Sequence, residues 1–181
     1  TGQSDVIIAG GCESMTCIPM GPAGAPVREA WVEEHEPGIY LSMGLTAENV
    51  AAKYGVTRLE MEELAVESHK RAAEATEKGL FKDQIIPVRG VDEEGNEIMV
   101  TVDQGIRKGT SLESLAKLKP CFKDDGVVTA ALASQTSDGA GFVVMMSAEK
   151  AKEVGLKPIA RFVGFAVAGC DPSYMGLGPI Y

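Results

Sequence analysis

Residues 126–146 constrain the fold more than any other stretch of the sequence. Residues 127–133 are small and apolar, and residues 134–139 form a polar hinge that ends in the turn dipeptide Asp138-Gly139. Residues 142–146 are a continuous apolar run, typical of a strand buried on both faces of a sheet. Small side chains would let a ligand lie close to the backbone of the loop. The same pattern also fits a tight turn before a core strand, and both interpretations stay open.

Composition excludes several classes of protein. The 181 residues are 45% hydrophobic and 24% charged, which is typical of a globular chain with one domain or one domain plus an insertion. The net charge of -9 argues against nucleic acid or a membrane surface as partner. No apolar run is long enough to span a bilayer, so we expect no membrane span.

The four cysteines show no metal-binding spacing. Cys12 and Cys17 have no second pair to complete a zinc site, so we expect no metal. Reduced thiols are the better interpretation, and they indicate a cytoplasmic protein. A predicted strand over residues 5–10 opens the chain almost at once, which favours an interior piece of a longer protein.

Caps and periodicity predict the other elements. Thr46 is the expected N-cap of a helix that Gly55 ends, and the capping box of Thr57 and Glu60 starts a long helix that runs to about Lys78. Residues 12–40 lack periodicity and are interpreted as an excursion over a surface or into a partner subunit. Further strands are expected over residues 84–88, 97–102 and 158–167, and short helices over 112–118 and from Ser147 to Gly155. Strands that alternate with helices in this way predict the α/β class.

Seven motifs, in order along the whole chain, resemble those of thiolases, the enzymes that cleave or form 3-oxoacyl-CoA. They are Ala-Gly-Gly-Cys-Glu-Ser-Met at residues 9–15, Met-Gly-Leu-Thr-Ala-Glu at 43–48, Gly-Ile-Arg at 105–107, Leu-Ala-Lys-Leu-Lys-Pro at 115–120, Thr-Ala at 129–130, Ser-Gln-Thr-Ser-Asp-Gly at 134–139 and Gly-Cys-Asp-Pro-Ser-Tyr-Met-Gly-Leu-Gly-Pro at 169–179.

The resemblance implies part of a thiolase-like αβαβα fold with an inserted α/β loop domain. Residues 1–10 would hold a strand of the N-terminal half, and residues 11–136 the loop domain that binds coenzyme A and takes part in oligomerisation. Residues 137–157 would complete the N-terminal half, and residues 158–181 would begin the C-terminal half.

Three residues are implied at the nucleotide end of a CoA site. Arg107 matches the family position that packs against the nucleotide, and the planar fork of arginine suits a phosphate or an adenine ring. Ser114 matches a position near the nucleotide, and Phe122 matches an apolar wall. The residues alone favour a solvated surface arginine beside Lys108 for Arg107, and a core side chain for Phe122.

Five residues are implied along the pantetheine arm and at the acyl end. Ala130 and Ala133 match positions where the backbone follows the pantetheine, and Ser134 matches a hydroxyl that bonds a pantetheine amide. Met43 and Met175 match the lining of the acyl tunnel, although methionines are also common core residues.

No catalytic residue is expected in this segment. Thiolase chemistry needs a nucleophilic cysteine, an activating histidine, a second cysteine and an oxyanion hole. The cysteines and histidines present match none of these family positions, and His69 is interpreted as a solvated histidine of the long helix. The isolated chain is therefore expected not to turn over. CoA and acyl-CoA are implied as substrates, and no permanently bound cofactor is expected.

The motifs favour a degradative 3-ketoacyl-CoA thiolase of fatty-acid β-oxidation. Ser42 stands where biosynthetic relatives usually carry histidine. The resemblance implies a homodimer or homotetramer, with a multifunctional β-oxidation subunit as a further partner. Three alternatives stay open: a biosynthetic acetyl-CoA acetyltransferase, a non-catalytic thiolase-like protein that binds acyl-CoA or a partner, and a ketoacyl synthase. The long insertion that contains Arg107 argues against the last.

Overall fold

The computed structural model describes residues 3–18 and 28–181 in two compact units. The ribbon unit contains the described residues of Thr1–Tyr40 together with Thr136–Cys170 and Ile180–Tyr181. The helical unit contains Leu41–Gln135 and Asp171–Pro179. The predicted domain boundaries after residues 10, 136 and 157 stay a prediction. Part of the predicted excursion, residues 19–27, lies outside the described residues.

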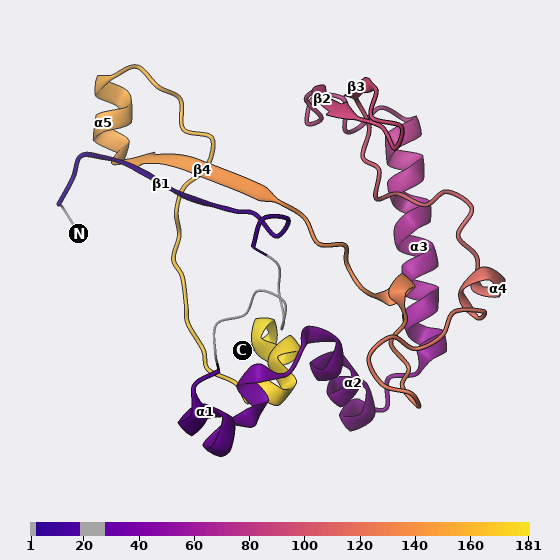
Figure 1. The fold of residues 1–181 in the computed structure, drawn as a ribbon. Coiled ribbons are helices and arrows are strands. Elements are labelled where there is room, and N and C mark those ends of the chain that lie inside the picture. Colours follow the sequence, from indigo (N-terminus) through magenta and orange to yellow (C-terminus); the bar gives the residue numbers. More distant parts are fainter. Residues whose placement is uncertain (1–2, 19–27) are drawn as a thin grey trace. The chain divides into compact units, whose positions relative to one another are not determined.

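A two-stranded antiparallel ribbon gives the ribbon unit its name (Figure 1). Strand β1 (Val6–Glu13) pairs with β4 (Gly139–Met146) from Val6 opposite Met146 to Glu13 opposite Gly139. Both predicted strands are therefore confirmed. Gly139 starts β4 instead of completing a turn, because Asp138 accepts the N–H of Thr16 at 3.0 Å and closes this end of the ribbon.

Burial of β4 on both faces, as expected from the sequence, is wrong for the described chain. Phe142, Val143 and Val144 are 58–63% exposed. Pairing with β1 satisfies backbone groups but leaves the side chains of both strands uncovered. The apolar run thus predicts the strand correctly and its environment incorrectly.

The other elements of the ribbon unit are short. They are α1 (Ala30–His35), η1 (Pro37–Tyr40) and α5 (Ala148–Glu153). Ser147 caps α5 as predicted, with its hydroxyl accepting the N–H of Lys150 at 3.0 Å. The strand predicted over residues 158–167 is wrong: these residues have no regular structure, because no described strand lies alongside to pair with them.

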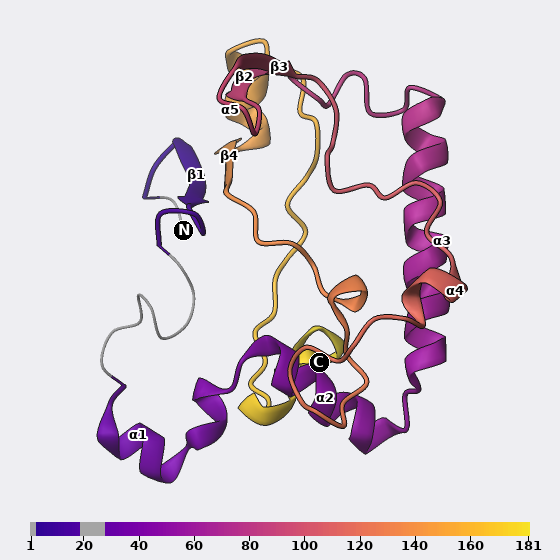
Figure 2. The same ribbon diagram turned by 45° about the vertical axis from the view of Figure 1, so that its right-hand side comes forward.

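Two helices dominate the helical unit (Figure 2). Helix α2 (Met43–Tyr54) begins one residue after Ser42, whose hydroxyl accepts the N–H of Leu45, so the predicted cap at Thr46 is wrong. Thr46 is instead buried inside the helix. Gly55 ends α2 in the left-handed conformation at φ 67°, as predicted.

The long helix α3 (Arg58–Glu77) confirms the predicted capping box. The Thr57 hydroxyl accepts the N–H of Glu60, and the Glu60 carboxylate accepts the N–H of Thr57 in return. The Thr57 N–H, and then the Thr57 hydroxyl, donate to the Glu60 carboxylate and lower the pKa of this carboxyl group. Gly79 follows the helix in the left-handed conformation, at φ 70°, and ends it as predicted.

A small hairpin joins β2 (Val88–Val91) to β3 (Glu97–Val100), with the predicted turn between them. The strand predicted over residues 84–88 begins only at Val88. The N–H groups of Gln84 and Ile85 instead donate to Phe81 O at 2.9 and 3.0 Å, and Pro87 has no N–H to offer.

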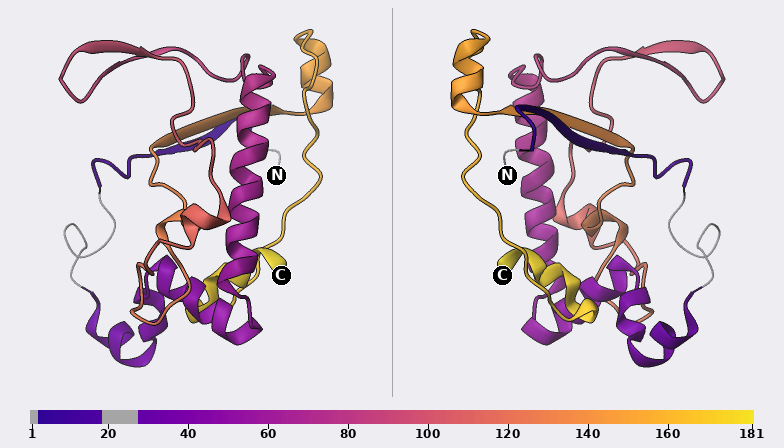
Figure 3. Two further views of the ribbon diagram at one scale, coloured as in Figure 1. Left: turned by 90° about the vertical axis from the view of Figure 1, so that its right-hand side faces the viewer. Right: turned by 90° about the vertical axis from the view of Figure 1, so that its left-hand side faces the viewer.

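Short helical turns complete the helical unit. They are α4 (Leu112–Leu115), which is shorter than predicted, η2 (Ala130–Leu132) and η3 (Pro172–Ile180). Helix α4 and η2 both contact α3, and Figure 3 shows α4 beside it. The apolar core is small, and its buried residues include Ala51, Leu115 and Val128. None of the helices within the described part of the chain is both long and apolar enough to cross a membrane.

Candidate ligand-binding site

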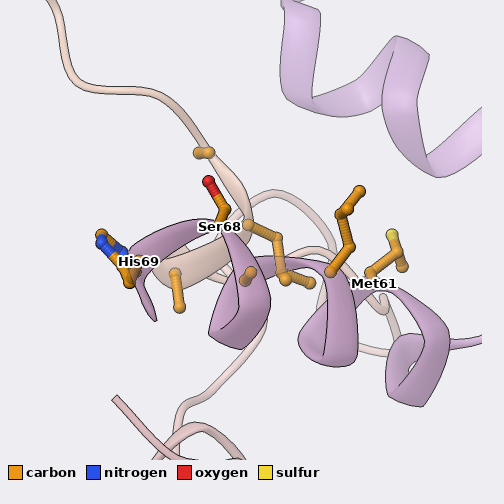
Figure 4. A pocket seen from close by; sticks show the side chains of 8 residues that line it. Met61, Ser68 and His69 are labelled. Atoms are coloured by element: carbon orange, nitrogen blue, oxygen red, sulfur yellow. The ribbon is translucent and has the colours of Figure 1, made fainter. Parts of the chain in front are cut away.

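An open groove of about 450 Å³ lies between helix α3 and the turn η2. Its lining comes from two segments that are far apart in the sequence: Met61, Leu64, Ala65, Ser68 and His69 of α3, and Ala131, Leu132 and Ala133 at η2. Figure 4 shows Met61 at one end of the groove and His69 at the other.

The helix supplies the groove with an apolar floor and a polar end. Met61, Leu64, Ala65 and Ser68 follow the spacing of one helix face, so their side chains share a direction. Leu64 lies on this mostly apolar face of α3, and yet it is 72% exposed. The groove therefore offers uncovered apolar surface beside a short, small-residue wall.

His69 connects this groove to the loop that carries Arg107. The backbone N–H of Arg107 donates to Nδ1 of His69 at 3.2 Å. The accepting Nδ1 carries no proton, so the neutral ring carries its proton on Nε2, where it can be donated. His69 lies on the long helix, as predicted; it is partly exposed, and it also lines two pockets, which the sequence did not indicate.

The second pocket, of about 330 Å³, lies on the adjacent side of α3 and is strongly charged. Arg107 lines it together with His69, Lys70 and Lys108, and Glu74 and Glu77 balance the cations. Lys108 pairs with Glu77 at 3.0 Å. The other two cations of the lining, Lys70 and Arg107, can therefore attract an anion. Lys70 makes only a long contact with Glu67, at 4.0 Å.

A glycine brings two of the sequence motifs together. A Cβ at Gly105 would lie 2.6 Å from Oε1 of Gln135 and 2.9 Å from its Nε2, so the glutamine side chain rests on this glycine. The loop that precedes Arg107 thus lies against the segment that follows Ser134.

Of the eight predicted site residues, Ala133 belongs to the described lining of the groove and Arg107 to that of the charged pocket. Ala130 starts η2, and both Ala130 and Ser134 are exposed at the two ends of the small-residue segment. Their assigned contacts with a ligand stay predictions.

Ser114 uses its hydroxyl within the chain. Its Oγ donates to Ser111 O at 2.7 Å and accepts the N–H of Ser111 at 3.2 Å, forming a capping box at α4. Arg58 holds this helix against α3 by donating to the carbonyls of Leu115 and Leu118 at 2.9 and 2.8 Å. The same guanidinium pairs with the buried Glu62 at 2.6 Å.

The remaining three predicted residues lie along α2. Met43 is the first residue of the helix, and the ring of Phe122 packs so closely on Gly44 that a Cβ there would overlap it. Met175 lies in η3, which α2 holds through a hydrogen bond from Asn49 Nδ2 to Ser173 O at 3.1 Å. Met43 and Met175 are half exposed.

Within the described residues no group of three or more histidine, cysteine and carboxylate side chains could hold a metal ion. All four cysteines are exposed free thiols.

Comparisons with known proteins now assign the family. The family model for the thiolase N-terminal domain matches residues 1–149. A 3-ketoacyl-CoA thiolase of Marinomonas sp. is 47% identical over 99% of this chain and 46% of its own length. An acetyl-CoA acetyltransferase of Chromobacterium violaceum is 42% identical over 99% of this chain and 48% of its own length. The chain belongs to the thiolase family, and it spans about half the length of these relatives.

Solved structures agree with this assignment. The dimeric peroxisomal thiolase of Saccharomyces cerevisiae matches 99% of this chain and 46% of its own chain, with a TM-score of 0.83 and 35% identity. Human mitochondrial 3-ketoacyl-CoA thiolase matches 96% of this chain and 47% of its own, with a TM-score of 0.75 and 37% identity. The prediction of part of an α/β thiolase fold is therefore confirmed.

Proposed function

We propose that this chain supplies the CoA-binding part of an acetyl-CoA C-acyltransferase, which transfers acyl groups between CoA thioesters and CoA. The observation that carries the proposal is the apolar groove at Ala133 next to the charged pocket at Arg107, with His69 in both. Coenzyme A has a narrow, weakly polar arm and a phosphorylated nucleotide, which are the two chemistries that these neighbouring pockets offer.

The pantetheine arm would lie in the groove, against the backbone of residues 130–133. Small side chains leave that backbone accessible, and Met61, Leu64 and Ala65 supply apolar surface opposite. The nucleotide phosphates would approach Arg107 and Lys70, whose charges are charge-assisted donors for phosphate oxygens. The Nε2–H of His69 would donate to a ligand oxygen between the two pockets.

The direction of the reaction is a finer part of the proposal. We propose the degradative reaction of fatty-acid β-oxidation, on the basis of Ser42 and the motif around Asp138. The acetyl-CoA acetyltransferase among the relatives supports the biosynthetic reaction as the second candidate. Turnover would require the nucleophilic cysteine, histidine and second cysteine of the family, which we do not assign in this segment.

The assembly and location are part of the same proposal. The yeast structure is of a dimeric thiolase, which supports a homodimer for the whole protein. A homotetramer, and association with a multifunctional β-oxidation subunit, are the other arrangements we consider. Four exposed free thiols support a cytoplasmic location, where cysteines stay reduced.

The site is tested by calorimetric titration of the protein with CoA, and separately with pantetheine. Arg107→Ala should weaken CoA binding by about tenfold or more, because a charge-assisted hydrogen bond contributes about 1.5–3 kcal/mol. It should leave pantetheine binding unchanged. Ala133→Val should weaken both ligands, since the added methyl groups narrow the groove.

Two matched variants control for unrelated effects. Arg89→Ala removes an exposed arginine of β2, and Ala140→Val enlarges an exposed alanine of β4. Both should bind CoA as the unaltered protein does. If Arg107→Ala and Ala133→Val both bind CoA with the affinity of the unaltered protein, the site assignment is overturned. Covalent acylation of this chain by acetoacetyl-CoA would overturn its assignment as non-catalytic.

A further inference from the structure

Glu48 is a buried carboxylate in the middle of helix α2, only 8% exposed. Its oxygens accept the backbone N–H of Val127 at 3.0 Å each, and Oε1 accepts the N–H of Val128 at 2.8 Å. Two consecutive N–H groups thus converge on one carboxylate that lies about eighty positions earlier in the chain.

Gly126, which precedes Val127, leaves room for this contact because it has no side chain. A Cβ at Gly126 would overlap Oε1 of Glu48 and lie 2.8 Å from its carboxyl carbon. Gly126 also donates its N–H to Lys123 O at 3.0 Å, which turns the chain toward Glu48. The carboxylate and the glycine therefore fit one another, and neither tolerates a bulkier neighbour without a shift.

The segment held by Glu48 leads directly into the groove wall. Val128 is buried, its carbonyl accepts the N–H of Cys121 at 3.0 Å, and Thr129 is fully buried. The carbonyl of Thr129 then accepts the N–H of Leu132 at 3.0 Å and closes η2. Only one residue, Thr129, separates the backbone bound by Glu48 from the turn that faces α3.

The other wall of the groove is independent of Glu48. Helix α3 is fixed at its start by its own capping box and by the pair of Arg58 with Glu62. A substitution that removes the Glu48 carboxylate should therefore displace η2 while leaving α3 in place. This asymmetry distinguishes a positioning role from a general loss of structure.

We propose that Glu48 is a positioning residue for the ligand groove, which sets the backbone of residues 126–129 and, through it, the wall at Ala131–Ala133. The inference rests on the proposed CoA site for its functional consequence. Its structural part, that the carboxylate fixes this backbone, does not depend on the identity of the ligand.

Amide hydrogen exchange tests the structural part at single-residue resolution. In Glu48→Gln, the remaining oxygen can still accept both N–H groups, but the negative charge and the second acceptor for the Val127 N–H are lost, which weakens both hydrogen bonds. The exchange rates of the Val127 and Val128 amides should rise by about tenfold or more, while amides of α3 exchange as before. Glu63→Gln, on the exposed side of α3, is the matched control and should change neither set.

The CoA titration tests the functional part. Glu48→Gln should weaken CoA and pantetheine binding together, whereas Arg107→Ala weakens CoA alone. Gly126→Ala approaches the same contact from its other side, and it should reproduce the pattern of Glu48→Gln. This second variant keeps the test valid if the first folds poorly.

The outcomes separate the two proposals. Unchanged exchange at Val127 and Val128 in Glu48→Gln, or exchange raised equally throughout α3, would overturn the positioning role. If the unaltered protein binds no CoA, the proposed function fails, and the exchange pattern alone then decides whether Glu48 fixes the segment.

Discussion

Glu48 and Asp92 both hold a loop by accepting backbone N–H groups, but they reach across very different stretches of sequence. Asp92 accepts the N–H groups of Glu94 and Asn96 at 3.1 and 2.8 Å, and it also accepts the side-chain amide of Asn96 at 3.0 Å. Its partners are two and four residues away. The partners of Glu48 are 79 and 80 residues away.

Their surroundings differ as much as their reach. Asp92 is accessible to water, which can replace any hydrogen bond that is lost, whereas Glu48 is buried and its N–H partners cannot find water without opening the unit. The local contact shapes a turn that the chain would largely form anyway. The remote contact decides where the groove wall lies, so its loss should have the larger effect.

The largest expected effect is that of Glu48→Ala. It leaves the N–H groups of Val127 and Val128 buried without acceptors, which should destabilise the helical unit by about 2–4 kcal/mol. Urea denaturation followed by circular dichroism measures the loss. A change as small as that of the control Glu63→Ala would contradict the assigned difference between buried and exposed carboxylates.

Gly126→Ala should have the next largest effect. The added methyl group meets the Glu48 carboxylate and forces a shift that costs about 1–3 kcal/mol. Gly139→Ala is the matched control, because a Cβ there meets no described atom within 4 Å. If Gly126→Ala and Gly139→Ala changed the free energy of unfolding equally, the close fit of Gly126 to Glu48 would be contradicted.

Thr129→Val should have the opposite sign. The Thr129 side chain is fully buried, and its hydroxyl has no hydrogen-bond partner among the described residues. Replacing it with a methyl group should stabilise the protein by about 1 kcal/mol. Calorimetric melting measures the gain, and a loss of stability would mean that this hydroxyl has a partner in solution.

Asp92→Ala should have the smallest effect, and one that remains local. Amide exchange at Glu94 and Asn96 should rise while the melting temperature falls less than in Glu48→Ala. Hydrogen bonds from the side chain and then the backbone of Asn96 lower the pKa of Asp92 below its usual 3.8. The folded hairpin therefore gains stability from this carboxylate above about pH 3.8, and it loses that gain as pH falls through the folded-state pKa.

The pH dependence is measured by following the Asn96 amide by NMR between pH 2 and 6, about two units on either side of that value. Its chemical shift should titrate below the pH at which Asp92 titrates in the unfolded chain. Titration at or above that value would show that the hairpin does not favour the charged carboxylate.

Locally encoded features were predictable from the sequence. The capping box at Thr57, the stops at Gly55 and Gly79 and the cap at Ser147 each depend on groups within four residues, so the chain carries the whole signal. The thiolase motifs likewise predicted the family. The wrong cap at Thr46 shows the limit of this reasoning, since Ser42 and Thr46 are both good caps and only packing buries one of them.

The site depended on contacts that no local pattern reveals. His69 looks like any polar residue of a long helix until the Arg107 loop donates to it. Glu48 has an alanine four residues later, at position 52, and Lys53 comes one position too late for an i,i+4 ion pair. Its neighbours in the sequence therefore do not indicate what the carboxylate binds. The one available signal was that Glu48 lies three residues before the buried Ala51, on the same side of α2.

By itself the sequence determined the family, the main helices, the strands β1 and β4 and the small-residue segment at residues 127–133, because each follows from spacing or from a cap close by. Tertiary structure alone decided that α3 faces this segment, that His69 connects the groove to Arg107, and that a buried carboxylate on α2 fixes the backbone at Val127 and Val128. Those contacts bring together residues dozens of positions apart, and their hydrogen bonds gain strength from burial that only the folded chain provides.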